Sequence, residues 1–164
     1  MNSKKLFICG FLFVSVIGSL LHFVYEWSGN NSIVRLFAPW NESTWEHMKL
    51  LFFPMLVLVL FLFFKLPEQS PIPVALSIGT LVGLALIPIL FYTYTGVLGF
   101  SVMAIDIAIF YISVLGVFLT GWFLKDNRKL ANRRGLLLTC LVILAILFFI
   151  FSYYPPEIGL FQEP

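Results

Sequence analysis

Five long apolar stretches alternate with short polar segments along the chain, and this alternation is its main structural signal. A helix that crosses the hydrocarbon core of a membrane needs about 20 mostly apolar residues. Each stretch reaches or approaches this length, so we predict an all-α fold: a single polytopic membrane helix bundle over residues 1–164. The five predicted transmembrane helices cover residues 6–25, 45–65, 72–92, 97–124 and 136–153.

The second stretch reaches the required length only with the help of polar residues. Its uninterrupted apolar part covers residues 50–64, which at 1.5 Å per residue extends only about 22 Å. The helix must therefore begin near Trp45 and include Glu46, His47 and Lys49 in its first turns. Because charged side chains are costly in lipid, we expect these three to face the membrane interface or a polar interior.

The composition supports a membrane protein and excludes other classes. Apolar residues make up 60% of the chain and charged residues 11%, with a mean hydropathy of +1.00. Soluble domains average about 45–50% apolar and about 25% charged residues. A water-soluble globule and a disordered chain are therefore both excluded. The formal net charge of +2 leaves no basic surface for nucleic acid, and the expected partner is the lipid bilayer.

The basic residues divide unevenly between the two sides of the predicted bundle. One side holds Lys4, Lys5, Lys65, Lys125, Arg128, Lys129, Arg133 and Arg134, and the other side holds Arg35 and Lys49. Positive charge favours the cytoplasmic side. We therefore predict that the N-terminus and the basic loop 125–134 are cytoplasmic, and that loop 26–44 and the C-terminus are outside.

Two polar or small-residue patterns within the spans predict contacts between helices. Asp106 lies inside the fourth span, where a carboxylate costs about 2.5–3.5 kcal/mol. We expect it to face the first helix, either as interhelical glue or as a proton carrier, metal ligand or substrate anchor. In the third span, Ala75, Gly79 and Gly83 recur every four residues, a pattern typical of close helix packing.

His22 and Glu26 lie four residues apart and therefore share one face of the first helix. A carboxylate that accepts the ring proton of a histidine fixes its tautomer and raises its basicity. The pair could therefore be a base with its orienting group, a pair of metal ligands, or an ion pair at the interface.

The segment Asn41-Glu42-Ser43-Thr44-Trp45-Glu46-His47 precedes the second apolar core. Its Ser43 and Glu46 fit the S-x-x-E capping box, in which Ser43 caps the helix and Glu46 reaches back. Trp45 would anchor the helix at the interface. This structural interpretation leaves Asn41, Glu42 and His47 without a role.

His22 lies near the outer end of the first helix and His47 near the outer start of the second, so we predict one shared outer pocket. Histidines and carboxylates at one depth indicate a divalent metal site with His22, His47, Glu26 and Glu42 as candidate ligands. Two facing imidazoles would also suit a haem. The candidate functional residues are His22, Glu26, Asn41, Glu42, Glu46, His47 and Asp106.

Three segments carry a resemblance to a known family. They are residues 21–29, residues 41–47 with Lys49 and Pro54, and the tail Tyr153-Tyr154-Pro155-Pro156. On these segments the chain resembles a family of small uncharacterised bacterial membrane proteins of clostridial type, a domain of unknown function with an NESxWEH segment. The resemblance implies a multi-pass protein of the bacterial inner membrane and implies no activity, ligand or catalytic residue.

Three functions remain open at this point. The first is binding or transport of a small solute, ion or metal at the outer polar site. The second is a membrane-embedded enzyme for a lipid-like substrate, with His22 or His47 as acid or base and Glu26, Glu42 or Asp106 as its partner. The third is a non-catalytic interaction protein. A homodimer would help to enclose a pathway that five helices barely surround.

Overall fold

The structure, a computed structural model, describes residues 2–163. These residues form five α-helices and three short 3₁₀-helices, and they contain no strand. Each α-helix is long and apolar enough to cross a membrane, which confirms the predicted all-α class. In chain order the elements are α1 (Ser3–Trp27), η1 (Val34–Leu36), α2 (Thr44–Lys65), α3 (Ile72–Leu98), α4 (Met103–Leu124), η2 (Arg128–Arg133), α5 (Arg134–Tyr153) and η3 (Gly159–Phe161).

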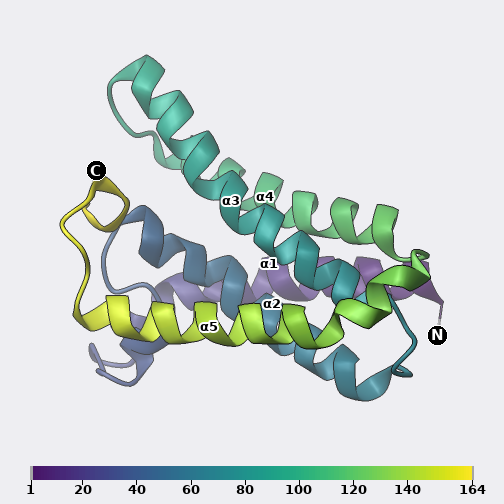
Figure 1. Cartoon of the computed structure of the whole chain (residues 1–164). Helices are drawn as coiled ribbons and strands as arrows, with labels where there is room; N and C mark the ends of the chain where they lie inside the picture. The colour runs from purple at the N-terminus through teal and green to yellow at the C-terminus, as the bar shows by residue number, and fades with distance from the viewer. Residues whose placement is uncertain (1, 164) are drawn as a thin grey trace.

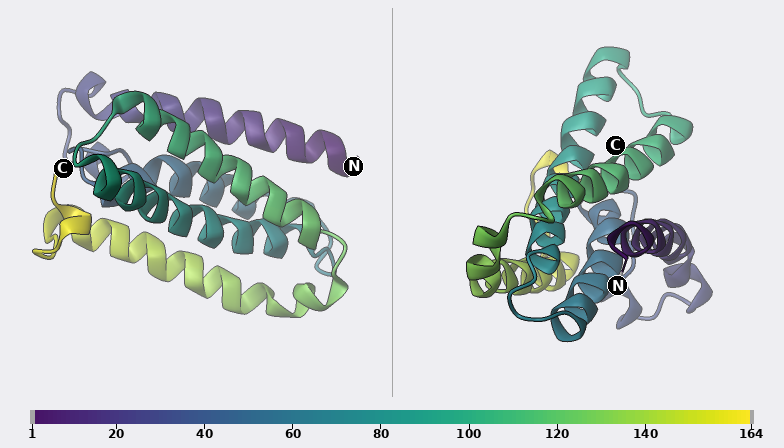
Figure 2. Two further views of the ribbon diagram at one scale, coloured as in Figure 1. Left: turned by 90° about the horizontal axis from the view of Figure 1, so that it is seen from above. Right: turned by 90° about the vertical axis from the view of Figure 1, so that its right-hand side faces the viewer.

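The five helices run up and down, so the chain termini lie at opposite ends of the bundle (Figures 1 and 2). We call one end the histidine end: α1 ends there at Trp27, α2 begins at Thr44, α3 ends at Leu98, α4 begins at Met103 and α5 ends at Tyr153. The opposite end is the basic end. It carries Lys4, Lys5, Lys65, Lys125, Arg128, Lys129, Arg133 and Arg134.

The connection between α3 and α4 differs from the sequence prediction. α3 continues to Leu98 instead of ending at residue 92, and α4 begins at Met103 instead of residue 97. Gly99 ends α3 with a left-handed φ of 81°, and its N–H donates to the carbonyl of Thr95. Such a glycine cap stops a helix within an apolar run, where hydropathy alone shows no boundary. Asp106 consequently lies in the first turn of α4.

Neighbouring helices approach one another closely at glycine residues. A Cβ built on Gly79 of α3 would lie 2.3 Å from the carbonyl oxygen of Val117 in α4, so the predicted small-residue packing face is confirmed. The same device joins α1 to α2, because a Cβ on Gly18 would lie 2.5 Å from the carbonyl oxygen of Leu50. Gly18 is one turn away from His22, so this contact brings the candidate residues of α1 against α2.

The C-terminal tail folds back over the start of α2 and changes the role of Trp45. Trp45 was expected at the interface but is buried, with its ring centroid 4.5 Å from that of Phe148, 4.9 Å from Phe161 and 5.6 Å from Phe151. The expectation was wrong because η3 and α5 cover this face of α2. Distant parts of the chain therefore fix the first turn of α2 in place.

Candidate functional site

The start of α2 is a tightly bonded turn. The Ser43 hydroxyl caps the helix by accepting a hydrogen bond from the backbone N–H of Glu46 at 3.4 Å, as predicted. The Asn41 side-chain oxygen accepts from the backbone N–H of Ser43 at 3.1 Å. The second half of the predicted capping box is wrong, because the Glu46 carboxylate does not return to Ser43 but turns toward Lys49 and Trp40. Asn41 and Ser43 thus shape the segment that carries Glu42 and His47.

His47 is held with one ring nitrogen free for a ligand. Its Nδ1 lies 3.0 Å from the carbonyl oxygen of Ser43, which can only accept a hydrogen bond. Nδ1 therefore carries the hydrogen of a neutral ring, and Nε2 keeps a lone pair. Nε2 lies 3.4 Å from Oε2 of Glu42. When the ring is neutral, His47 Nε2 and Glu42 Oε2 are both acceptors and cannot bond each other directly. A proton or a metal cation between them would satisfy both atoms.

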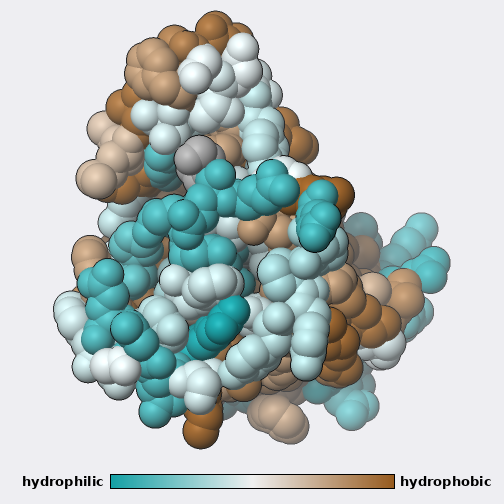
Figure 3. Space-filling model, turned by 90° about the vertical axis from the view of Figure 1, so that its left-hand side faces the viewer, coloured by the Kyte–Doolittle hydropathy of each residue, from teal (hydrophilic) through white to brown (hydrophobic). Residues whose placement is uncertain are grey.

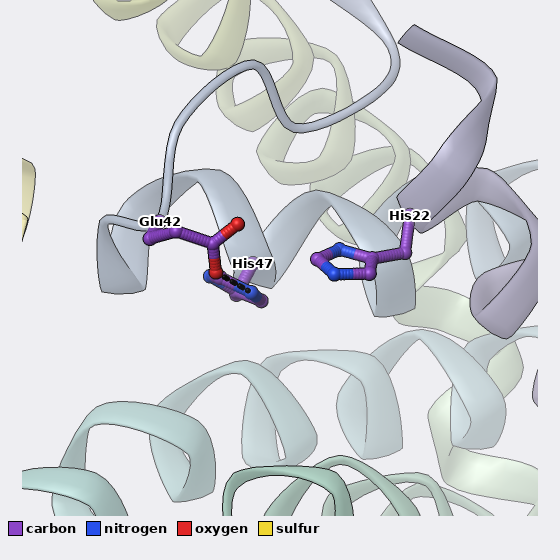
Figure 4. A group of neighbouring side chains, drawn as sticks. All are labelled: His22, Glu42 and His47. Carbon is purple, nitrogen blue, oxygen red and sulfur yellow. Dashed lines mark ion pairs between the residues drawn. The ribbon is translucent and has the colours of Figure 1, made fainter. Parts of the chain in front are cut away.

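His22 completes the cluster from the opposite helix. Its ring centroid lies 5.3 Å from that of His47, and the two rings are tilted by 37°. Its Nδ1 is buried and has no hydrogen-bond partner among residues 2–163. Figure 4 shows Glu42 and His47 together at the start of α2, with the His22 ring reaching toward them from α1. One ligand atom from each of the three residues lies within 4.8 Å of the others.

The cluster has the donor set of a transition-metal site. Two imidazoles and one carboxylate are the ligands of many three-ligand zinc centres, which keep a fourth position open for water or substrate. A backbone carbonyl that accepts the other ring N–H is the usual outer partner of a metal-bound histidine, and the Ser43 carbonyl has this place beside His47. We call His22, Glu42 and His47 the metal triad, after the donor set that they offer.

The other sequence candidates around the triad play different parts. Glu26 is exposed and forms no ion pair in the described chain. With Asn41 and Trp40 it lines a polar pocket of about 110 Å³ that also borders His22 and Glu42. Of the two carboxylates proposed as ligands, only Glu42 belongs to the triad.

Glu46 belongs to a separate buried network that sequence analysis identified only in part. Lys49 is 0% exposed and Glu46 is 2% exposed, as expected for residues that avoid lipid. The Lys49 ammonium donates to the Glu46 carboxylate at 2.6 Å, to the Ser152 hydroxyl at 2.6 Å and to the Arg35 carbonyl at 2.9 Å. All three of its donors are therefore used, and the network joins α2, α5 and the loop before α2.

Arg35 extends this network within the segment between α1 and α2. Its guanidinium lies 3.7 Å from the Trp40 ring centroid and donates to the carbonyl of Ser152 at 2.6 Å. The sequence offered one signal for it, because Arg35 and Lys49 are the two basic residues at the otherwise acidic end. Ser152 gave no signal, since a serine within an apolar helix is ordinary.

Asp106 lies outside the triad. Its carboxylate accepts a hydrogen bond from the hydroxyl of Tyr94 in α3, and that hydroxyl also accepts from the backbone N–H of Val102 at 3.0 Å. The bonded partner of Asp106 is thus on α3, and Asp106 also lines a space shared with Ser19 and His22 of α1, the helix it was predicted to face. The turn after Gly99 permits the bond to Tyr94, because it returns the first turn of α4 to the end of α3.

A cleft opens beside the triad at the histidine end. The ends of α3 and α4 lean away from the other helices there (Figure 1), and the space between them and α1 and α2 has a volume of about 770 Å³. All three triad residues line it, and Asp106 lies on its α4 side. Figure 3 looks onto this end of the molecule, where polar side chains gather below the tip of the α3–α4 hairpin.

These features define a multi-pass, all-helical membrane protein with a histidine–carboxylate cluster at one end of the bundle. The chain belongs to DUF6512, a family of unknown function, whose family model matches residues 1–164. Searches of curated proteins and of solved structures found no match to the chain.

Proposed function

We propose that this protein binds one divalent transition-metal ion at the histidine end of its bundle, with His22, Glu42 and His47 as the ligands. The observation that carries the proposal is the convergence of three ligand atoms within 4.8 Å from two helices and the loop between them. Imidazole and carboxylate together suit borderline ions of the zinc type.

The surroundings of the triad support a metal more than a simple ion pair. An ion pair between protonated His47 and Glu42 explains two of the three residues, but it leaves His22 unused. His22 has a buried ring nitrogen without a hydrogen-bond partner in the described chain. A second protonated histidine 5.3 Å from the first would be repelled. A metal ion satisfies both rings and the carboxylate together.

The position of the site favours binding over conduction. The site lies at one end of the bundle, and α2 continues toward the basic end with fully buried apolar side chains, including Leu51, Met55 and Val59. These side chains fill the bundle below the triad. With the N-terminus in the cytoplasm, as the charge distribution favours, the metal would face the outer side of the membrane.

The test is metal stoichiometry and affinity in purified protein. Protein stripped with a chelator and titrated with Zn²⁺ should bind one ion per chain, and Co²⁺ should give the visible absorption of a tetrahedral site. His22→Gln, His47→Gln and Glu42→Gln should each weaken Zn²⁺ binding by at least about 100-fold, because loss of even an outer partner costs about 10–100-fold.

Glu26→Gln is the matched control, since Glu26 is a carboxylate near His22 that lies outside the triad. It should leave Zn²⁺ affinity within about twofold of the original protein. Equal Zn²⁺ affinity in the original protein and in folded triad variants would refute the proposal. It would leave the His47–Glu42 contact as an ion pair.

A further inference from the structure

The cleft beside the triad is lined by apolar and by polar side chains. Its apolar side chains come from all four surrounding helices and include Phe23, Leu50, Ile87, Phe91 and Phe110. The triad residues belong to its polar lining, together with Ser19, Thr44, Asp106 and Tyr111. Its volume of about 770 Å³ lies within the range of about 300–1,000 Å³ typical of small-molecule sites.

The α4 wall of the cleft carries exposed apolar side chains. Met103 and Ile107 on its α4 wall are 78% and 53% exposed. Both belong to a helix that is long and apolar enough to cross a membrane. On a helix that crosses a membrane, exposed apolar side chains can meet lipid tails, so we expect this wall to admit an apolar chain from the membrane.

The charges that line the cleft are acidic. Glu42, Asp106 and Glu163 border it, and no lysine or arginine does so among residues 2–163. A cluster of carboxylates repels an anionic head group. A divalent ion on the triad would reverse this where it binds, because it would supply two positive charges and an open coordination position.

We infer that the cleft binds an amphiphile with one apolar chain and a carboxylate-type head group, and that the head group takes the open position on the metal. This inference rests on the proposed metal site. The apolar chain occupies the space between α1, α2 and the leaning ends of α3 and α4. Binding of the anionic head therefore depends on the metal, while the cleft walls select for the chain.

The test uses the full chain in phosphatidylcholine nanodiscs and a stearic acid that carries a nitroxide on its chain. The electron paramagnetic resonance spectrum separates immobilised from mobile probe, and the pH is set so that the fatty acid is ionised. Loading with Zn²⁺ should produce an immobilised component that a chelator removes. The Zn²⁺ content of each sample is measured separately.

Ile107→Trp adds bulk to the α4 wall of the cleft, and Leu115→Trp is its matched control on the same helix. The two original side chains are similarly exposed, at 53% and 47%, but only Ile107 lines the cleft. Ile107→Trp should keep its Zn²⁺ and bind the probe at least about fivefold more weakly, because over-packing an occupied space is unfavourable. Leu115→Trp should behave as the original protein does.

Three other outcomes would contradict the amphiphile site, the metal site or both. Bound Zn²⁺ with no immobilised probe, or with equal immobilisation in Ile107→Trp, would overturn the inference and leave the metal site standing. Immobilisation of a spin-labelled long-chain ammonium in metal-free protein, without immobilisation of the fatty acid, would show a site for cationic amphiphiles instead. Absence of Zn²⁺ from the original protein would remove the metal site and this inference with it.

Discussion

Lys49 and Glu46 form an ion pair that is almost fully removed from solvent. Its contribution to the stability of the protein differs from that of a surface salt bridge. Removing two charges from water is costly, and the cost is recovered only when the hydrogen bonds are complete. Here the ammonium has three acceptors, and the carboxylate accepts from Lys49 at 2.6 Å and from the Trp40 N–H at 3.4 Å. The pair holds the loop that carries Glu42 against α2 and α5.

Lys49→Met should therefore destabilise the protein strongly, because it leaves the Glu46 carboxylate buried without its cation. We expect a loss of about 3–5 kcal/mol in the free energy of unfolding. The double variant Lys49→Met with Glu46→Gln removes both charges and should recover more than half of this loss. The measurement is unfolding by titration with sodium dodecyl sulfate in mixed micelles. A single variant as stable as the original would show that the pair is not stabilising the loop.

At the scale of helices, the contact between α1 and α2 decides whether the metal triad can form. His22 is on α1, while Glu42 and His47 are at the start of α2, so the distance between the helix axes sets the distance between the ligands. Gly18 permits the close approach, because its missing side chain makes room for the Leu50 carbonyl. We therefore expect this glycine to influence the site without touching it.

Gly18→Leu should separate α1 from α2 and weaken Zn²⁺ binding by at least about tenfold, since a displaced helix carries His22 away from its partners. Gly96→Leu is the control, because a Cβ at Gly96 meets no atom within 4 Å among the described residues. It should leave Zn²⁺ affinity unchanged. Isothermal titration calorimetry measures both. Unchanged affinity in folded Gly18→Leu would mean that the α1–α2 distance does not control the site.

At the scale of the whole molecule, the two ends of the bundle differ in chemistry. The basic end carries eight lysines and arginines, namely Lys4, Lys5, Lys65, Lys125, Arg128, Lys129, Arg133 and Arg134, and the histidine end carries the metal triad and the cleft. Basic loops anchor at the cytoplasmic surface, where they meet anionic lipid. The proposed metal and amphiphile sites would then be reached from the outside.

Accessibility of single cysteines to a membrane-impermeant thiol reagent tests this orientation. Ser28 and Asn127 are exposed and lie at the histidine end and the basic end, respectively. In a background without Cys9 and Cys140, Ser28→Cys should be labelled in intact cells. Asn127→Cys should be labelled only after the membrane is opened. Labelling of Asn127→Cys in intact cells would reverse the orientation and place the triad in the cytoplasm.

The sequence by itself determined the class of fold and the region where the chemistry gathers. The free energy of transferring a helix into lipid is a sum of contributions from its own residues. Composition and length were therefore enough to predict five apolar helices. The short apolar core of α2 likewise required Glu46 and Lys49 to avoid lipid, and both are buried. The shared depth of His22 and His47 followed from two antiparallel helices joined by one loop.

Only the tertiary structure decided which carboxylate meets the histidines. Three carboxylates are close enough to the histidines along the chain to reach them, namely Glu26, Glu42 and Glu46. The path of the backbone directs Glu42 to His47 and Glu46 to Lys49, and it leaves Glu26 exposed. The pairing of Asp106 with Tyr94 and the cleft beside them likewise depend on the turn at Gly99 and the lean of α3 and α4. These features arise from contacts between helices distant in the chain, whereas hydropathy and periodicity describe each helix alone.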